Sequence, residues 1–210
     1  MSGRPTVEHV LLDADGVLQD LPGGWFEGVR PWLGDRAEAF MRASWSDEEP
    51  CLRGECDFLV HLENQLRAWD VDVPVREVFE AVWHSIELVP SSIELVHRLR
   101  AAGYGVHLGT NQEQHRGAYM RTELGYDELF ETSCYSHELG VTKSDPRYFE
   151  LAVERIGVEP ATVLFVDDVL GNVENARSVG LAAVHWTFLD GLDVLEAAMA
   201  EHGVHPAPRS

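Results

Sequence analysis

The sequence predicts an α/β fold: a parallel β-sheet with helices on both faces, plus an inserted α-helical segment. Two observations support this class. From Pro90 onward, short apolar runs alternate with helical patterns, which is typical of a parallel sheet covered on both faces. Between Trp25 and Glu87 the apolar spacing is instead helical, so this stretch interrupts the alternation. We therefore expect one sheet whose first strand is separated from the others by a helical insert.

The chain opens on a buried strand that ends in two carboxylates. Apolar residues from Val10 to Leu12 run directly into Asp13-Ala14-Asp15-Gly16. A strand that ends in acids places them at the carboxyl edge of the sheet, where open α/β folds bind ligands. Residues two apart in an extended chain point the same way, so both carboxylates can converge on one small group. Taken alone, the motif also fits a surface turn.

A turn-rich link from Gln19 to Gly24 leads into the predicted insert of four or so helices. Five of the six tryptophans lie in it, at positions 25, 32, 45, 69 and 83. Positions 58, 59, 62 and 66 are apolar with helical spacing, and positions 78, 79, 82 and 83 repeat the pattern. Aromatic side chains bury large areas, so we interpret the tryptophans as the core of the insert and not as a cofactor site.

The second half of the chain alternates helices and strands. A capping box at Ser91 and Glu94 predicts the start of its first helix, and Gly103 predicts the stop. Pro146 is expected at the first position of a later helix. The predicted strands are residues 105–109, 130–135, 162–166 and 182–186, and the predicted helices are 91–103, 113–124, 145–156, 172–179 and 192–202.

Composition narrows the possible functions. The chain carries 36 acidic and 16 basic residues, a net charge of −20, which disfavours nucleic acid and anionic membranes as partners. No stretch has the apolar length of a signal peptide or a membrane span. Cys51, Cys56 and Cys134 fit no zinc spacing, so we expect three thiols and a cytoplasmic location. The oligomeric state, monomer or homodimer, stays open.

Four polar groups end predicted strands or precede the next helix: Asp13 with Asp15, Thr110 with Asn111, Lys143, and Asp167 with Asp168. Singly, each fits a helix cap, a solvated charge or a turn. In a parallel sheet, however, the strand ends share one edge, where three acids would repel each other without a cation. Carboxylates suit Mg²⁺, while a lysine, a hydroxyl group and a helix start can bind phosphate. The set indicates phosphoryl chemistry, with one carboxylate as nucleophile and a second as acid and base.

These residues resemble the four motifs of the haloacid dehalogenase superfamily of hydrolases, and the resemblance covers nearly the whole chain. The motifs correspond to residues 13–17, 108–111, 140–149, and 164–168 with Asn172 and Ala176. The resemblance implies a Rossmann-like catalytic core at 1–18 and 88–210, and an α-helical cap at 19–87. The fourth motif and residues 52–55 are similar to subfamily I members with a C1 cap, a branch that contains sugar-phosphate phosphatases and the phosphatase domains fused to epoxide hydrolases.

The resemblance implies a role for each acid. Asp13 would be the nucleophile and a metal ligand. Asp15 would be the general acid and base, and its backbone carbonyl would also bind Mg²⁺. Asp168 would complete the metal site, with Asp167 beside it as a further candidate ligand.

The resemblance also implies a phosphate site. Thr110 and Asn111 would bind the phosphoryl oxygens, and Lys143 would neutralise the pentavalent transition state. The third motif carries Ser144 where many relatives carry proline, which leaves the lysine in place.

The implied function is a Mg²⁺-dependent phosphatase of a small phosphorylated metabolite, with a sugar phosphate as one candidate. Dehalogenation is disfavoured because halide leaves without a proton, and the family's dehalogenases lack an acid at the position of Asp15. A phosphomutase that uses the same aspartyl-phosphate stays open. The intact set of Asp13, Asp15, Lys143 and Asp168 disfavours a non-catalytic binding protein. Weaker candidates for contact with the leaving group are Gln19, Trp25, Arg53 and Trp45, the last with core packing as the preferred interpretation.

Overall fold

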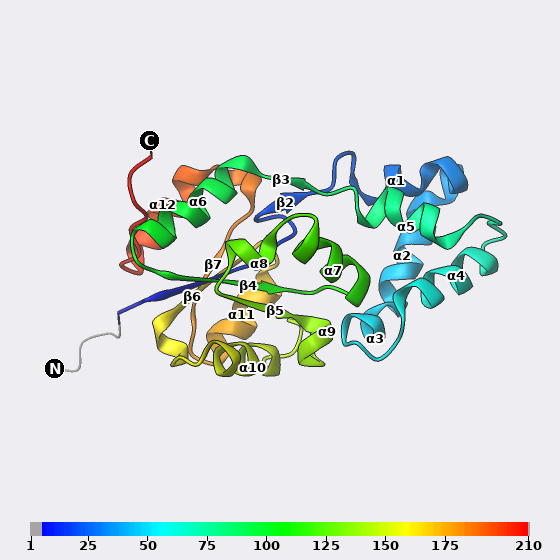
Figure 1. Cartoon of the computed structure of the whole chain (residues 1–210). Helices are drawn as coiled ribbons and strands as arrows, with labels where there is room; N and C mark the ends of the chain where they lie inside the picture. The colour runs from blue at the N-terminus through cyan, green and yellow to red at the C-terminus, as the bar shows by residue number, and fades with distance from the viewer. Residues whose placement is uncertain (1–5, 210) are drawn as a thin grey trace.

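The structure, a computed structural model, describes residues 6–209 (Figure 1). Its main sheet has five parallel strands in the order β5-β4-β1-β6-β7, so the first strand of the chain lies in the middle. β1 (His9–Leu12) pairs with β4 (Gly105–Thr110) on one side and with β6 (Val163–Asp167) on the other. β5 (Thr132–Tyr135) and β7 (Ala182–His185) form the edges. The predicted α/β class is confirmed.

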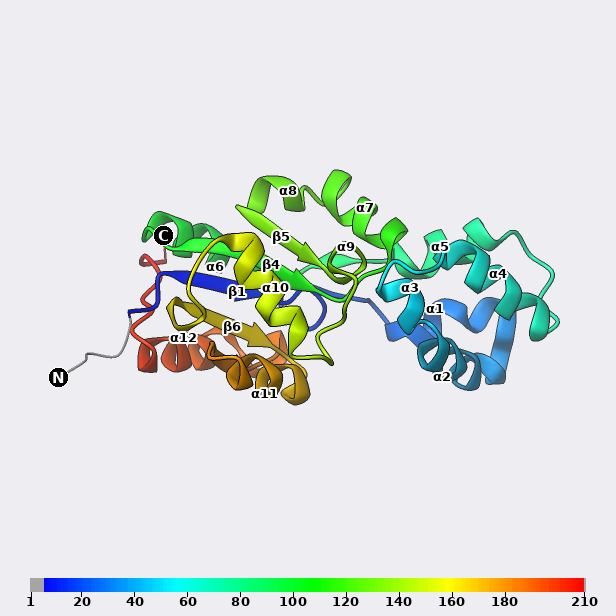
Figure 2. The ribbon, with the colours of Figure 1, turned by 90° about the horizontal axis from the view of Figure 1, so that it is seen from below.

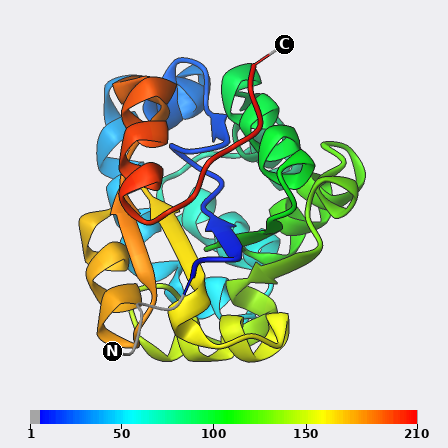
Figure 3. The same cartoon turned by 90° about the vertical axis from the view of Figure 1, so that its left-hand side faces the viewer.

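Helices cover both faces of the sheet, as Figure 3 shows in a view along the strands. Successive residues of β1 alternate between two hydrophobic clusters, because strand side chains point to opposite faces. Val10 and Leu12 enter one cluster, and Leu11 enters the other. The first is completed by α6 (Pro90–Ala101), α7 (Gln114–Thr122) and α12 (Leu192–Glu201), and the second by α10 (Arg147–Ile156) and α11 (Leu170–Ser178).

Five helices between β1 and the rest of the sheet pack around a third hydrophobic cluster. They are α1 (Gly24–Leu33), α2 (Ala37–Asp47), α3 (Glu49–Leu52), α4 (Phe58–Ala68) and α5 (Val75–Trp83). All five tryptophans of this stretch belong to the cluster or pack against it, as expected. We call these helices, residues 24–83, the helical unit; it lies beyond the carboxyl ends of the strands (Figure 2).

The chain enters and leaves the helical unit through a small antiparallel ladder of β2 (Gln19–Asp20) and β3 (Glu87–Leu88). Both connections therefore lie side by side. This ladder coincides with the ends of the segment 19–87 predicted as a separate unit, and we propose that it separates two domains. The sequence pattern did not predict the ladder, because two residues a strand are too few to show a period.

Some local predictions are wrong. α6 begins at Pro90 with no side-chain cap, so the predicted capping box at Ser91 and Glu94 is absent. Proline suits the first helical turn, where its missing N–H costs nothing, and the helix therefore starts earlier. Pro146 lies one position before α10 instead of inside it. Two single-turn helices, α8 (Tyr126–Leu129) and α9 (Ser136–Leu139), were also not predicted.

The cysteines also differ from the expectation. Cys51 and Cys56 form a disulfide, with 4.6 Å between their Cα atoms, because the turn after α3 folds back on itself. Cys134 is the buried free thiol. The disulfide removes part of the argument for a cytoplasmic location. Among residues 6–209, no helix has the length and apolar character needed to cross a membrane.

Candidate active site

The ends of three adjacent strands open into a cavity of about 500 Å³ between the sheet and the helical unit. Asp13 directly follows β1, Thr110 ends β4 and Asp167 ends β6. Because these strands are parallel neighbours, residues far apart in the sequence meet at this edge. The predicted site residues that line the cavity are Asp13, Asp15, Thr110, Asn111, Lys143 and Asp168.

Asp13 lies at the bottom of the cavity, with only 5% of its surface exposed. Its Oδ1 accepts a hydrogen bond from the backbone N–H of Ala14 (2.7 Å) and lies 2.6 Å from Nζ of Lys143. Burial raises the pKa of Asp13 well above its usual range; Lys143 opposes this, and the charge of Asp167 adds to it. Asp13 is therefore fixed in place beside a positive charge.

Lys143 is the single lysine of the chain, against 15 arginines. It is buried, and its Nζ contacts Oδ2 of Asp167 (2.7 Å) as well as Asp13. Burial alone would lower the pKa of Lys143, but the two carboxylates outweigh it and raise the pKa, so the side chain carries a charge. Its loop is held on both sides: Asn111 Oδ1 accepts from the Lys143 N–H (2.9 Å), and Asn175 Nδ2 donates to the Lys143 carbonyl (3.0 Å).

Three carboxylates meet around this lysine. Asp13, Asp167 and Asp168 each offer an oxygen, and these oxygens lie within 4.8 Å of one another. Asp167 already accepts from Asn172 Nδ2 and from the Val169 N–H, besides Lys143. Burial raises the pKa of Asp168; the charge of Asp167 adds to this, and Lys143 opposes it. A hard cation with oxygen ligands, such as Mg²⁺, fits this donor set. The Asp15 carboxylate is not part of it.

Gly16 allows the close approach of Asp168 to the strand end. Its φ of +76° lies in the left-handed region. A Cβ at this position would lie within 2.5 Å of two atoms of the Asp168 carboxylate. Glycine is therefore the residue that this turn can accommodate without displacing Asp168.

Thr110 and Asn111 stand at the opposite side of the lysine. The Thr110 side chain is buried at the end of β4 and accepts a hydrogen bond from Gln112 Nε2 (3.1 Å). With Asn111 Oδ1 engaged by the Lys143 N–H, the amide NH₂ of Asn111 remains as a donor. Neither residue caps α7, because its N-cap is Glu113, which accepts from the N–H groups of the first turn. The helix-cap alternative for Thr110 and Asn111 is therefore wrong.

Asp15 points to a partner that the sequence did not predict. Both of its oxygens accept from the guanidinium of Arg116, at 2.7 and 2.8 Å. Gln19 Nε2 and Gln112 Nε2 each donate to it at 2.8 Å. Burial alone would raise the pKa of Asp15, but Arg116 and the two amides outweigh it and lower the pKa to about 2. The available signal was an arginine in the first turn of the helix after Asn111.

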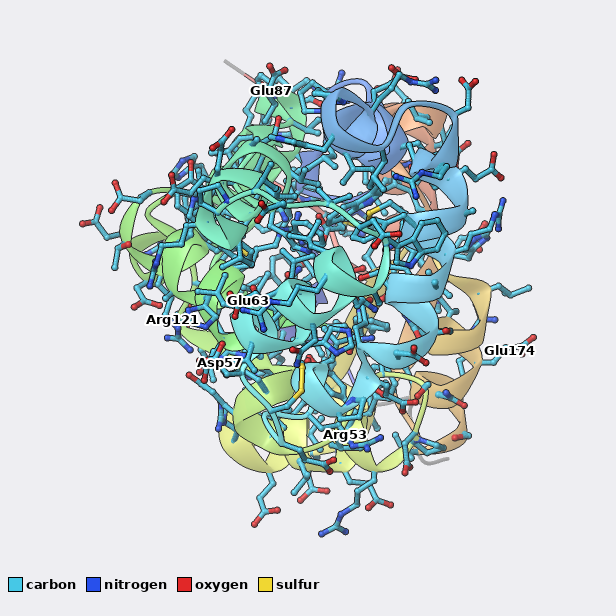
Figure 4. The ribbon with its side chains drawn as sticks, turned by 90° about the vertical axis from the view of Figure 1, so that its right-hand side faces the viewer. Arg53, Asp57, Glu63, Glu87, Arg121 and Glu174 are labelled. Carbon is cyan, nitrogen blue, oxygen red and sulfur yellow. A yellow bond between two sulfur atoms is a disulfide. The ribbon has the colours of Figure 1, made fainter. Side chains whose placement is uncertain are left out.

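The weaker candidates are divided between three environments. Gln19 and Trp25 line the main cavity. Trp45 lines a second cavity of about 220 Å³, which also borders on Asp15. Arg53 lies on the outer surface of the helical unit, where it pairs with Glu49 (3.1 Å) and Glu55 (2.9 Å), and lines neither cavity (Figure 4). Its predicted contact with a leaving group is therefore not supported.

Comparison with known families decides the relationship. The family model described as haloacid dehalogenase-like hydrolase matches residues 7–180, which is most of the chain. This chain belongs to the haloacid dehalogenase-like hydrolases. The predicted family and the prediction of a hydrolytic enzyme are thereby confirmed.

Individual relatives of this hydrolase are distant. A "Phosphorylated carbohydrates phosphatase" from Thermotoga maritima is 25% identical, over 91% of both chains. A HAD family enzyme from Bacteroides thetaiotaomicron, solved with magnesium and inorganic phosphate, is 18% identical, with a TM-score of 0.73 over 85% of this chain and 93% of its own. An L-2-haloacid dehalogenase from Xanthobacter autotrophicus is 20% identical, with a TM-score of 0.66 over 85% and 76%. Because a phosphatase and a dehalogenase are both among these similar proteins, the residues of the site have to distinguish the two activities.

Proposed function

We propose that this hydrolase is a Mg²⁺-dependent phosphatase that removes the phosphoryl group from a small phosphorylated metabolite. The observation that carries the proposal is the buried Asp13, which lies beside a charged lysine and two further carboxylates and faces a cavity. The similarity to a phosphorylated carbohydrates phosphatase makes sugar phosphates the first substrates to test.

In the first step, a carboxylate oxygen of Asp13 attacks phosphorus, and the bond from phosphorus to the leaving oxygen breaks. Lys143, the Thr110 hydroxyl and the Asn111 amide would bind the phosphoryl oxygens. Asp15, whose pKa Arg116 lowers, would first take up a proton from solvent against that effect and then pass it to the leaving oxygen, so that an alcohol departs and an aspartyl-phosphate remains on Asp13.

In the second step, water attacks the aspartyl-phosphate. Asp15, now a carboxylate, takes the proton from that water, and the bond between phosphorus and Asp13 breaks to give inorganic phosphate. Asp13, Asp168 and the backbone carbonyl of Asp15 are the proposed ligands of Mg²⁺, with Asp167 adjoining. When bound, the ion would supply positive charge against the phosphoryl oxygens.

Two alternatives use the same residues differently. A phosphomutase would transfer the phosphoryl group from Asp13 to another hydroxyl, so its product is an isomer and not free phosphate. A dehalogenase would need no acid, and the carboxylate at Asp15 argues against it. A purely binding role leaves the buried charge of Asp13 and Lys143 without a purpose.

The decisive test is hydrolysis of p-nitrophenyl phosphate by the purified chain. We expect Mg²⁺-dependent release of phosphate, loss of activity with EDTA, and a loss of at least about a thousandfold in Asp13→Asn. Asp72→Asn, an exposed aspartate between α4 and α5, is the matched control and should keep full activity. Activity retained in Asp13→Asn would disprove the nucleophile, and release of chloride from 2-chloropropionate would favour dehalogenation.

A further inference from the structure

We propose that Arg116 is a positioning residue that holds the Asp15 carboxylate at the cavity and links its position to the helical unit. The inference rests on the proposed phosphatase function, in which Asp15 transfers protons to and from the reacting oxygens.

The first support is the shape of the contact between Arg116 and Asp15. Nη1 of Arg116 lies 2.7 Å from Oδ2 of Asp15, and Nη2 lies 2.8 Å from Oδ1. A planar guanidinium that donates to both oxygens fixes the plane of the carboxylate, which a single ammonium cannot do. The Arg116 side chain is only 3% exposed, so surrounding atoms hold its guanidinium group in place.

The second support is that Asp15 is oriented and still accessible. Gln19 and Gln112 donate one further hydrogen bond to each oxygen. Gln112 Oε1 also accepts from Nη1 of Arg116 (2.8 Å), so Gln112 and Arg116, which both donate to Asp15, are hydrogen-bonded to each other. Yet 41% of the Asp15 side chain remains exposed, where it lines both cavities. A leaving group can therefore reach a carboxylate whose direction is already set.

The third support is the remaining side of Arg116, which contacts the helical unit. Its Nε donates to the backbone carbonyl of Trp83 (3.0 Å), the last residue of α5. Its guanidinium carbon lies 5.1 Å from the centre of a Trp25 ring, in α1. Movement of the helical unit away from the sheet would remove both contacts. The guanidinium group that holds Asp15 would then lose two of the contacts that fix its position.

The rest of α7 strengthens this connection. His115 Nε2 contacts Oδ1 of Asp57 (2.9 Å), the residue that caps α4. The ring of Tyr119 stacks on His84, which directly follows α5, with 3.9 Å between ring centres. α7 thus contacts the helical unit through His115, Arg116 and Tyr119, and Arg116 also reaches the reaction site.

The test uses two phosphate esters that differ in their need for a proton. Nitrophenolate leaves p-nitrophenyl phosphate unaided, whereas the alkoxide of glycerol 1-phosphate needs protonation. In Arg116→Lys we expect kcat/KM for the alkyl ester to fall about 100-fold and that for the aryl ester less than about 5-fold, since general acid catalysis contributes about 10²–10⁴. Arg121→Lys, in the same helix with surface partners Asp127 and Glu138, is the matched control and should change neither value.

A double mutant separates positioning from a general structural role. If Arg116 acts through Asp15, Arg116→Lys in the Asp15→Asn background should cost no further activity toward the alkyl ester. Losses that add in the double mutant, or an Arg116→Lys loss that is equal for both esters, would overturn the proposal. A wild-type chain that hydrolyses neither ester would instead overturn the proposed function.

A second variant covers the case in which Arg116→Lys fails to fold, as circular dichroism would show. Gln112→Met keeps the charge pair and a similar volume but removes one donor to Asp15, one acceptor of Arg116 and the donor to Thr110. We expect the same dependence on the leaving group with a smaller loss, about 10-fold for the alkyl ester. Equal losses of activity toward the two esters would again contradict a positioning role for Arg116.

Discussion

Two buried cations stand at the same edge of the sheet and do different things. Lys143 contacts Asp13 and Asp167, and both of these partners belong to strand ends of the sheet. Arg116 contacts Asp15 and, on its other side, the helical unit. The compact ammonium thus serves a fixed reaction centre, while the planar guanidinium connects that centre to a second part of the molecule. The comparison teaches that phosphoryl binding and proton transfer, in the proposed reaction, depend on different parts of the fold.

Removing Lys143 should show most clearly how its role differs from that of Arg116. In Lys143→Met we expect kcat to fall about 100- to 1000-fold for both aryl and alkyl phosphates, because the lost charge faces the phosphoryl group and not the leaving group. The loss should also lower the free energy of unfolding by about 3–5 kcal/mol, since Asp13 and Asp167 remain buried without a cation. Steady-state kinetics and chemical denaturation measure the two effects. A loss confined to the alkyl ester would place Lys143 in the same role as Arg116.

Gly16 directly follows Asp15 and lies against Asp168, and its substitution should have a smaller effect on activity than Lys143→Met. In Gly16→Ala the new methyl group would displace the Asp168 carboxylate, so we expect the Mg²⁺ concentration for half-maximal activity to rise about 10-fold. The ratio of alkyl to aryl hydrolysis should stay unchanged, because Arg116 and its contacts are untouched. Gly171→Ala in α11 is the control, since a Cβ there meets no atom within 4 Å. An unaltered Mg²⁺ titration would show that Asp168 is no ligand.

The smallest expected effect is on thermal stability and concerns Glu48, which lies near Arg116. Burial raises the pKa of Glu48 from 4.5 to about 7; the nearby Arg116 opposes this, and Glu113 adds to it. The folded state thus holds this proton more tightly than the unfolded chain, and stability falls as pH rises from 4.5 through about 7.

Glu48→Gln should therefore raise Tm by about 2–4 °C at pH 8 and leave it unchanged at pH 4.5, which thermal melts at both pH values would measure. Glu174→Gln, an exposed glutamate of α11 (Figure 4), serves as the control. Equal Tm values for Glu48→Gln and the wild type at pH 8 would contradict the expected cost of ionising Glu48.

The site could be predicted from the sequence where one strand and its following residues determine the placement. Asp13, Thr110 and Asp167 follow or end apolar runs, and parallel pairing then brings them together. Arg116 was missed because its role depends on a contact between α7 and α5, which no local pattern encodes. The disulfide was missed for a related reason: the turn between Cys51 and Cys56 is irregular, and only the folded loop brings their Cα atoms close.

The burial of Lys143 has a consequence for the chemistry of the whole surface. With its one lysine inside, the folded protein presents no side-chain amine to solvent; its exposed cations are guanidinium groups. Reagents that acylate or cross-link amines would therefore find no exposed side-chain amine in the native state, and the amine of Lys143 would become available on unfolding. Mass spectrometry after acylation would thus count the proportion of molecules in which the reaction centre has opened.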